Sequence, residues 1–159
     1  MPLLLYLDQN YLSGFAKDKP AFRELLPVLR GAVERGVVAV VESAVHERES
    51  APRPDLELLP LLRSLSAGRR LPDSPDARLR SRMAWTIANE LPERAARESD
   101  AADLDALAVA VAHCDVVTCD AFMADVLRRM RVRCELYTGR RPDVLALRDR
   151  LAGLSEARR

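Results

Sequence analysis

The sequence predicts an α/β fold: a three-layer α/β/α arrangement around a mainly parallel sheet of four to five strands. Four short apolar runs, at 3–7, 36–42, 114–120 and 131–137, have the length and composition of buried strands. Segments with helical spacing separate them, and alternating strands and helices are typical of a parallel sheet covered on both faces. We expect one domain, 1–159, with a short C-terminal tail.

The first half of the chain gives two strand–helix units. The first apolar run ends on Asp8, and polar, helical sequence follows it. Residues 21–35 have helical spacing, with Pro27 as the point where this helix can break. The valine-rich run at 36–42 predicts the second strand, and Ser43 is a favourable N-cap for the helix after it.

The rest of the chain is expected to add five helices. They cover residues 55–66, 76–98, 101–112, 122–130 and 143–154. The first two form a helical insert at about 55–98, divided by a stretch that contains Gly68 and Pro75.

Composition excludes several classes of protein. A net charge of +1 argues against a strongly cationic protein that coats nucleic acid. The three cysteines have no metal-finger spacing, and their odd number without a signal peptide predicts a reduced, cytoplasmic chain. The apolar start is too short to span a membrane, so no membrane partner is expected.

Aspartates end two of the predicted strands. Asp8 follows the first apolar run and Asp120 closes the third. A buried strand needs no acid at its end, and an ionised carboxylate without a partner is costly to bury. Because the carboxyl ends of parallel strands meet at one edge of a sheet, where ligand sites form, we expect both aspartates to belong to a site there.

Helical geometry selects one glutamate of the helix that begins at Ser43. If Val45 faces the core, Glu49 lies four positions on, over the same face. Glu47 lies two positions on, roughly on the opposite side. Glu49 is therefore expected to face the protein and Glu47 the solvent, while Glu42, at the end of the second strand, is a weaker candidate.

The helix at 101–112 has three aspartates near its start. With about 100° of rotation per residue, Asp100 falls within the apolar stripe, Asp103 at its edge and Asp105 well away from it. The helix dipole favours acids at helix N-termini, and this effect alone accounts for Asp100. We therefore take Asp103 as the site residue and Asp100 as the reserve.

Four acids are then expected to share one pocket: Asp8, Glu49, Asp103 and Asp120. Four carboxylates cannot all stay ionised at close range without a cation. Hard oxygen ligands select Mg²⁺ or Mn²⁺. The amide of Asn10 and the hydroxyl of Thr118 are suited to hold a carboxylate or a water in that pocket.

Other reactive side chains have ordinary explanations. His46 and His113 are expected to be partly buried and hydrogen-bonded, and Cys114 and Cys119 to pack beside a strand rather than bind zinc. The basic run after residue 127 comprises Arg128, Arg129, Arg131 and Arg133. Such runs are usually solvated surface, although their members are able to meet an RNA backbone.

These motifs, in this order, resemble those of PIN-domain ribonucleases. The matching segments are LDQN at 7–10, SAVHERE at 43–49 and DAADLDALAVAVAHCDVVTCD at 100–120. In that family a strand ends in Asp-x-Asn or Asp-x-Ser, a Ser-then-Glu segment opens a helix, an aspartate opens an Ala-rich helix, and Thr-x-Asp ends the next strand. The residues that match are Asp8 with Asn10, Ser43 with Glu49, Asp103, and Thr118 with Asp120.

The resemblance implies metal-dependent cleavage of single-stranded or structured RNA by a metal-activated water. It assigns catalysis and the binding of Mg²⁺ or Mn²⁺ to Asp8, Glu49, Asp103 and Asp120, with support from Asn10, Ser43, Thr118 and Asp100. It is compatible with a stand-alone nuclease and with the toxin of a toxin–antitoxin pair. The expected partners are therefore RNA and, in addition, an antitoxin protein or a second copy of the chain.

Two alternatives stay open. A PIN fold can serve as a binding or assembly module without catalysis, although retention of all four acids argues against this. A haloacid-dehalogenase-like phosphatase also has an aspartate after its first strand. Its pattern needs a second acid where this chain has Asn10, and a catalytic lysine, whereas Lys17 and Lys19 are the only lysines and lie in the wrong place.

Overall fold

A sheet of four parallel strands forms the centre of the computed structural model, which describes residues 1–94 and 100–158. The strands are β1 (Leu3–Tyr6), β2 (Val38–Val41), β3 (Val116–Thr118) and β4 (Glu135–Tyr137). Their order across the sheet is β2-β1-β3-β4, and each pairs in parallel with its neighbours. The predicted α/β class with a parallel sheet is therefore confirmed.

Eight α-helices surround this sheet in the described part of the chain. They are α1 (Gln9–Ala16), α2 (Pro20–Glu34), α3 (Ala44–Ser50), α4 (Leu58–Ser66), α5 (Ala77–Glu90), α6 (Asp100–His113), α7 (Ala121–Arg129) and α8 (Arg141–Ala157). None of the helices within the described residues combines the length and the apolar character needed to cross a membrane.

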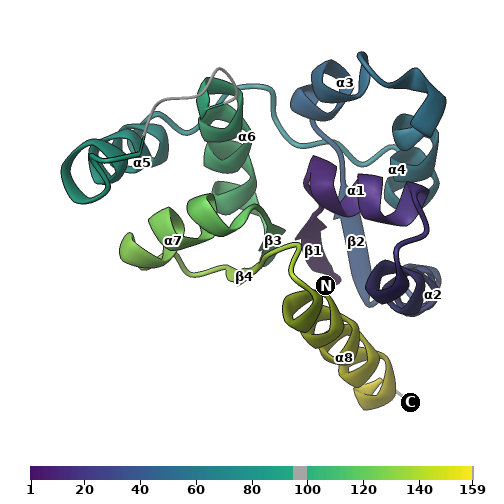
Figure 1. Cartoon of the computed structure of the whole chain (residues 1–159). Helices are drawn as coiled ribbons and strands as arrows, with labels where there is room; N and C mark the ends of the chain where they lie inside the picture. Colours follow the sequence, from purple (N-terminus) through teal and green to yellow (C-terminus); the bar gives the residue numbers. More distant parts are fainter. Residues whose placement is uncertain (95–99, 159) are drawn as a thin grey trace.

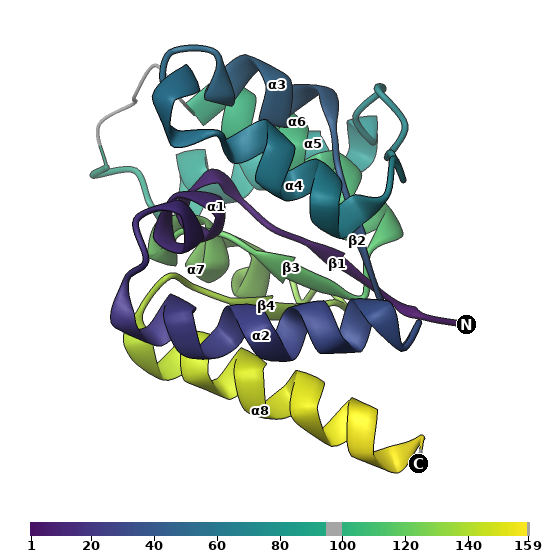
Figure 2. The same cartoon turned by 90° about the vertical axis from the view of Figure 1, so that its right-hand side faces the viewer.

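Helices cover both faces of the sheet, because the side chains of β1 alternate between two hydrophobic cores. Leu5 and Leu7 lie in a core with α1, α2, α4 and α8, whereas Tyr6 lies in a core with α3, α5, α6 and α7. Figure 1 shows α5, α6 and α7 on one side of the strands and α1, α2 and α4 on the other. Figure 2 shows α8 running alongside α2.

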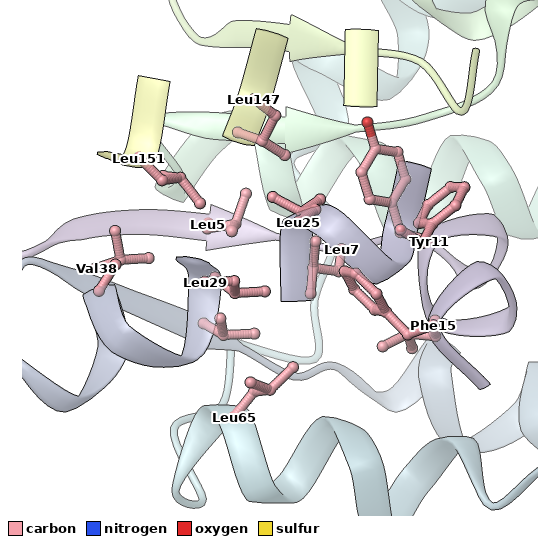
Figure 3. Close-up of a cluster of buried hydrophobic side chains, with 14 of the residues drawn as sticks. Leu5, Leu7, Tyr11, Phe15, Leu25, Leu29, Val38, Leu65, Leu147 and Leu151 are labelled. Atoms are coloured by element: carbon pink, nitrogen blue, oxygen red, sulfur yellow. The ribbon is translucent and has the colours of Figure 1, made fainter. Parts of the chain in front are cut away.

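Aromatic packing fixes α1 against α2 in the first core (Figure 3). The rings of Tyr11 and Phe15 meet Phe22 edge to face, with ring centroids 5.1 and 5.5 Å away. A Cβ atom on Gly14 would lie 2.7 Å from the Phe22 ring, so only glycine fits there. The Tyr11 hydroxyl donates to the Thr138 carbonyl at 2.7 Å, which anchors α1 to the end of β4.

Two predicted helix boundaries were wrong for local reasons. The helix expected at 76–98 ends at Glu90, because the residue before Pro92 is disfavoured in helical geometry; residues 95–98 of that prediction lie outside the described residues. The helix expected at 55–66 is split, since Glu57 has a left-handed backbone with φ of 52°. A short 3₁₀ helix, Pro54–Leu56, precedes this point and α4 follows it.

Two other expectations also differ from the structure. α2 continues through Pro27, which is exposed, so the carbonyl that loses its amide partner can bond to water. The strand expected at 131–137 is confined to β4, because Arg131 has a φ of 55° and the chain turns there after α7. The predicted insert is also divided between the layers: α4 packs on α1 and β2, whereas α5 packs on α6 and α7.

Strand order creates a crevice at the carboxyl edge of the sheet. The chain passes from β1 to β2 on one side and later places β3 on the other side of β1. The connections that follow β1 and β3 therefore diverge to opposite sides, which is the switch point where open parallel sheets bind ligands. Asp8 and Asp120 each follow their strand by two residues at this point.

Candidate functional site

The two strand-end aspartates both cap helices. Asp8 is the N-cap of α1, and its Oδ1 accepts from the Tyr11 amide at 3.3 Å. Asp120 is the N-cap of α7, and its Oδ1 accepts from the Met123 amide at 2.7 Å. Capping alone does not explain a carboxylate, because asparagine or serine caps a helix equally well without a charge.

Thr118 connects the ends of the two central strands. Its hydroxyl accepts from the Asp8 amide at 2.8 Å and donates to Asp8 Oδ1, also at 2.8 Å. The hydroxyl therefore holds the aspartate of the neighbouring strand and not the nearby Asp120. Among the described residues, both hydrogen bonds to the Asp8 carboxylate use Oδ1, so Oδ2 is left for another partner.

The structure brings the four predicted acids together. A cavity of about 210 Å³ is lined by Asp8, Glu49, Asp103 and Asp120, with Asn10 beside them. The remaining lining residues are Tyr6, Gln9, Ala106, Leu107, Cys119 and Met123. The four acids come from four places in the sequence: the ends of β1 and β3, the last turn of α3 and the first turn of α6.

Burial and mutual repulsion raise the pKa values of three of these acids. Burial raises the pKa of Asp8 to about 6, and the charge of Asp120 adds to the effect. Burial and then the charges of Asp103 and Asp8 raise the pKa of Glu49 to about 7. Burial, Asp120, Asp100 and Asp8 raise the pKa of Asp103 to about 6. The charge of each carboxylate therefore affects the ionisation of its neighbours. No lysine, arginine or histidine among the described residues lines the cavity to offset this repulsion.

Glu49 and Asp103 have no hydrogen bond or ion pair among the described residues that accounts for their positions. Within residues 1–94 and 100–158, neither carboxylate forms a hydrogen bond or an ion pair. Each is partly buried and faces other acids. Such a position opposes folding unless the charge is compensated by a proton or a cation.

The donor set suits a hard divalent cation, although the side chains are not arranged as a finished coordination shell. In the described part of the chain, no three acidic, histidine or cysteine side chains are placed to hold one ion. The lining of the cavity nevertheless offers carboxylate oxygens, and Gln9 Oε1 is buried without a hydrogen-bond partner in the part of the chain that the structure describes. Carboxylate and amide oxygens are the ligands that Mg²⁺ and Mn²⁺ prefer.

Several other acids have structural partners outside the cavity. Glu47 faces outward, as predicted, and accepts from Arg70 at 2.7 Å. Glu42 is buried and held by Ser66 at 2.8 Å and by Arg70 at 3.2 Å. Asp100, the reserve candidate, accepts two bonds from Arg94, at 3.0 and 3.1 Å, and does not line the cavity.

Ser43 and His46 hold α3 in place beside the cavity without lining it. His46 Nε2 lies 2.6 Å from the Leu7 carbonyl, which can only accept, so this nitrogen carries the proton. His46 Nδ1 then accepts from the Ser43 amide at 3.0 Å, and burial lowers the pKa of the ring. Ser43 thus begins α3 and does not line the cavity, whereas His46 joins α3 to the residue before Asp8.

The prediction for the two histidines was right for one of them. His46 is fully buried and hydrogen-bonded, as expected, but His113 is exposed at the end of α6. Cys114 and Cys119 are buried beside β3, which agrees with a packing role.

Sequence reasoning missed Tyr6 and Gln9 as lining residues. Tyr6 faces the second core and stacks on His46, with ring centroids 4.9 Å apart. Its place in the cavity follows from strand alternation, because Leu5 and Leu7 face the opposite side. Gln9 carried no usable signal, since its position depends on how α1 turns away from β1.

Comparison of the chain with protein-family models, with curated proteins and with solved structures gave no match. Function is therefore inferred from the geometry and chemistry of the cavity.

Proposed function

We propose that this protein is a metal-dependent ribonuclease of the PIN type. The observation that carries the proposal is the convergence of Asp8, Glu49, Asp103 and Asp120 on one cavity at the switch point of the sheet. Two of these acids have no structural bond among the described residues, so fold stability does not account for them. Acids that oppose folding are expected where function requires them.

The residues divide into two pairs with different constraints. Asp8 and Asp120 are held by helix caps, and Asp8 also by Thr118, so their positions are fixed by β1 and β3. Glu49 and Asp103 enter the cavity from helices α3 and α6, and no bond among the described residues fixes their side chains. The four would hold a cation between a rigid pair and an adjustable pair.

A divalent cation held by these oxygens supplies Lewis acidity for the attack of water on a phosphodiester and neutralises developing charge. The chain contributes ligands and position. Among the described residues no histidine lines the cavity. Cys119 does line it, but burial raises the pKa of its thiol, which disfavours a nucleophilic thiolate. Hydrolysis without a covalent intermediate is therefore the reaction that suits these side chains.

The two alternatives make different demands on the same cavity. A phosphatase of the haloacid-dehalogenase type needs a lysine at the reacting aspartate, and neither Lys17 nor Lys19 lines the cavity. A binding module without catalysis has no need for four converging acids. Titration with Mn²⁺ separates the nuclease from the module, because only the nuclease requires a divalent site.

The substitution Asp120→Asn tests the proposal. Asparagine keeps the Oδ1 atom that caps α7 but removes the charge that would hold a cation. We expect the variant to lose nearly all Mn²⁺-dependent cleavage of single-stranded RNA, while its metal-free form melts at or above the temperature of the wild type.

The matched control is Asp125→Asn, on the same helix, where the carboxylate pairs with Arg129 at 3.1 Å on the surface. This variant is expected to cleave normally. Equal cleavage by all three proteins in an electrophoretic assay would refute the proposal.

A further inference from the structure

A second cavity adjoins the acidic one. It has a volume of about 350 Å³ and shares Asn10 and Asp120 with the first. Its other lining residues are Ser13, Lys17, Lys19, Phe22, Ala121, Thr138, Gly139 and Arg140. They belong to α1, the α1–α2 turn, the first turn of α2, the start of α7 and the β4–α8 turn. We call this second cavity the basic groove.

The basic groove is lined by cationic side chains that form no ion pair or side-chain hydrogen bond among the described residues. Lys17 and Lys19 are the only lysines of the chain, and both line it together with Arg140. Among the described residues, none of these three side chains forms an ion pair or a hydrogen bond. The nearby Asp18 is already paired with Arg23 at 2.9 Å and does not line the groove.

Backbone geometry adds to the positive potential. Ala121 and Arg140 stand at the N-terminal ends of α7 and α8, which carry partial positive charge. Gly139 has no side chain to fill the space, and a Cβ there would lie 4.0 Å from Asn10. Figure 2 shows the α1–α2 turn and the β4–α8 turn at the same edge of the molecule, to which the strands point.

The one acid of the basic groove links it to the proposed site of cleavage. Asp120 is common to both cavities, so an extended ligand that fills one passes directly into the other. Three cationic side chains beside a cluster of acids suit an extended polyanion. The side chains would neutralise its backbone, and a metal ion held by the acids would bind one of its phosphates.

We propose that the basic groove binds the phosphodiester backbone of the RNA strand next to the bond that is cleaved. The inference rests on the proposed nuclease function for the identity of the strand. Lys17, Lys19 and Arg140 contact phosphates on one side of the acidic cavity, and Asn10 lies at the junction. The arginine run after residue 127 is not needed for this path, since none of its four members lines either cavity and Arg129 pairs with Asp125 and Glu90.

The double variant Lys17→Gln/Lys19→Gln tests the basic groove. Both side chains are exposed, and both residues cap helices through backbone groups only, so the fold should persist. The matched control is Arg30→Gln/Arg35→Gln, which removes the same charge from exposed positions of α2 and its C-cap that line neither cavity.

The probe is a fluorescein-labelled decauridylate, and binding is measured by anisotropy in EDTA over a range of salt concentrations. For Lys17→Gln/Lys19→Gln we expect Kd to rise at least about tenfold. The slope of log K against log salt should shrink by about 1.4, which corresponds to two lost phosphate contacts on a single strand. The control should bind within about twofold of the wild type.

Cleavage of the same RNA with Mn²⁺ separates the two proposals. If the wild type cleaves but the lysine variant and the control have the same Kd and salt slope, RNA binding by the basic groove is refuted while the nuclease function is supported. If the two variants differ in binding but the wild type does not cleave, the proposed nuclease function is refuted and the basic groove is supported as a site that binds a nucleic-acid strand. If the wild type does not bind the decauridylate, the proposal that the basic groove binds RNA is refuted.

Discussion

Glu47 and Glu49 are two residues apart on α3 and have opposite surroundings. Glu47 is exposed and bound to Arg70, which lowers its pKa, whereas burial and neighbouring acids raise the pKa of Glu49 to about 7. The 100° rotation per residue predicts this difference, because one glutamate shares the face of Val45 and the other does not. At the scale of single residues, helical phase identified acids that face inward.

The raised pKa of Asp103 predicts a pH dependence of stability. A carboxyl whose pKa is higher in the folded than in the unfolded chain stabilises the fold below the unfolded value, and this contribution is lost as pH rises through the folded value. For Asp103 the window runs from 3.8 to about 6. In EDTA, Asp103→Asn should therefore gain stability relative to the wild type across this window, by on the order of 1 kcal/mol at pH 8.

The measurement is urea denaturation of both proteins between pH 4 and 8. Buried His46 has a lowered pKa and so acts in the opposite direction, losing its contribution as pH falls below 6.5. It is present in both proteins, so the difference between them reports Asp103 together with its repulsion of Glu49. A difference that does not change with pH would contradict the account.

At the scale of elements, His46 ties α3 to the end of β1. It donates to the Leu7 carbonyl and accepts from the Ser43 amide, and its ring stacks on Tyr6. This tie fixes the helix that carries Glu49 relative to the strand that carries Asp8. A shift of α3 would therefore move one acid away from the others.

The substitution His46→Phe should weaken this tie. Phenylalanine keeps a ring against Tyr6 but leaves a buried carbonyl and a buried amide without partners, which costs roughly 1–3 kcal/mol. Urea denaturation measures the loss, and His113→Phe, at an exposed position, is the control. Equal stability of His46→Phe and the wild type would show that the two hydrogen bonds do not hold α3.

Elements were predictable where one local signal dominated. Apolar runs identified β1, β2 and β3, because a strand buried on both faces needs continuous apolar residues. Boundaries failed where a single backbone feature decided them, as at Glu57 and Arg131, whose positive φ values have no reliable signal in a non-glycine residue. Pro27 was a misleading signal, since its effect depends on which side of α2 faces water.

At the scale of the whole molecule, the strand order places the acids together. β1 and β3 are neighbours although more than 100 residues separate them, and an aspartate follows each of them by two residues. The sequence indicated which acids point inward, but the approach of Lys17 and Lys19 to Arg140 depends on how the α1–α2 turn and the β4–α8 turn come together. That tertiary arrangement carries no local signal, so the sequence did not reveal the basic groove.

Cation binding should stabilise the whole fold. Repulsion among the four acids is relieved by a bound divalent ion, and an ion that binds the folded state at 100 times its Kd adds about 2.7 kcal/mol. For a chain of this size we expect Mn²⁺ to raise Tm by about 5–10 °C. Differential scanning calorimetry measures the shift.

The comparison protein for that shift is Asp8→Asn. Asparagine can still accept from the Tyr11 amide and from Thr118, so the local structure is kept while one charge is lost. The rise in Tm should be much smaller in this variant. The same rise in both proteins would indicate that Mn²⁺ binds elsewhere.

The proposed cleavage of RNA at the acidic cavity with a divalent cation can be tested in a single assay. Labelled single-stranded RNA is incubated with Mn²⁺ and the wild type, Glu49→Gln or Glu47→Gln, and with the wild type in excess EDTA. We predict that Glu47→Gln cleaves like the wild type, that Glu49→Gln is slower by at least about 100-fold, and that EDTA abolishes cleavage. Cleavage by Glu49→Gln at the wild-type rate, or wild-type cleavage that survives EDTA, would contradict the account.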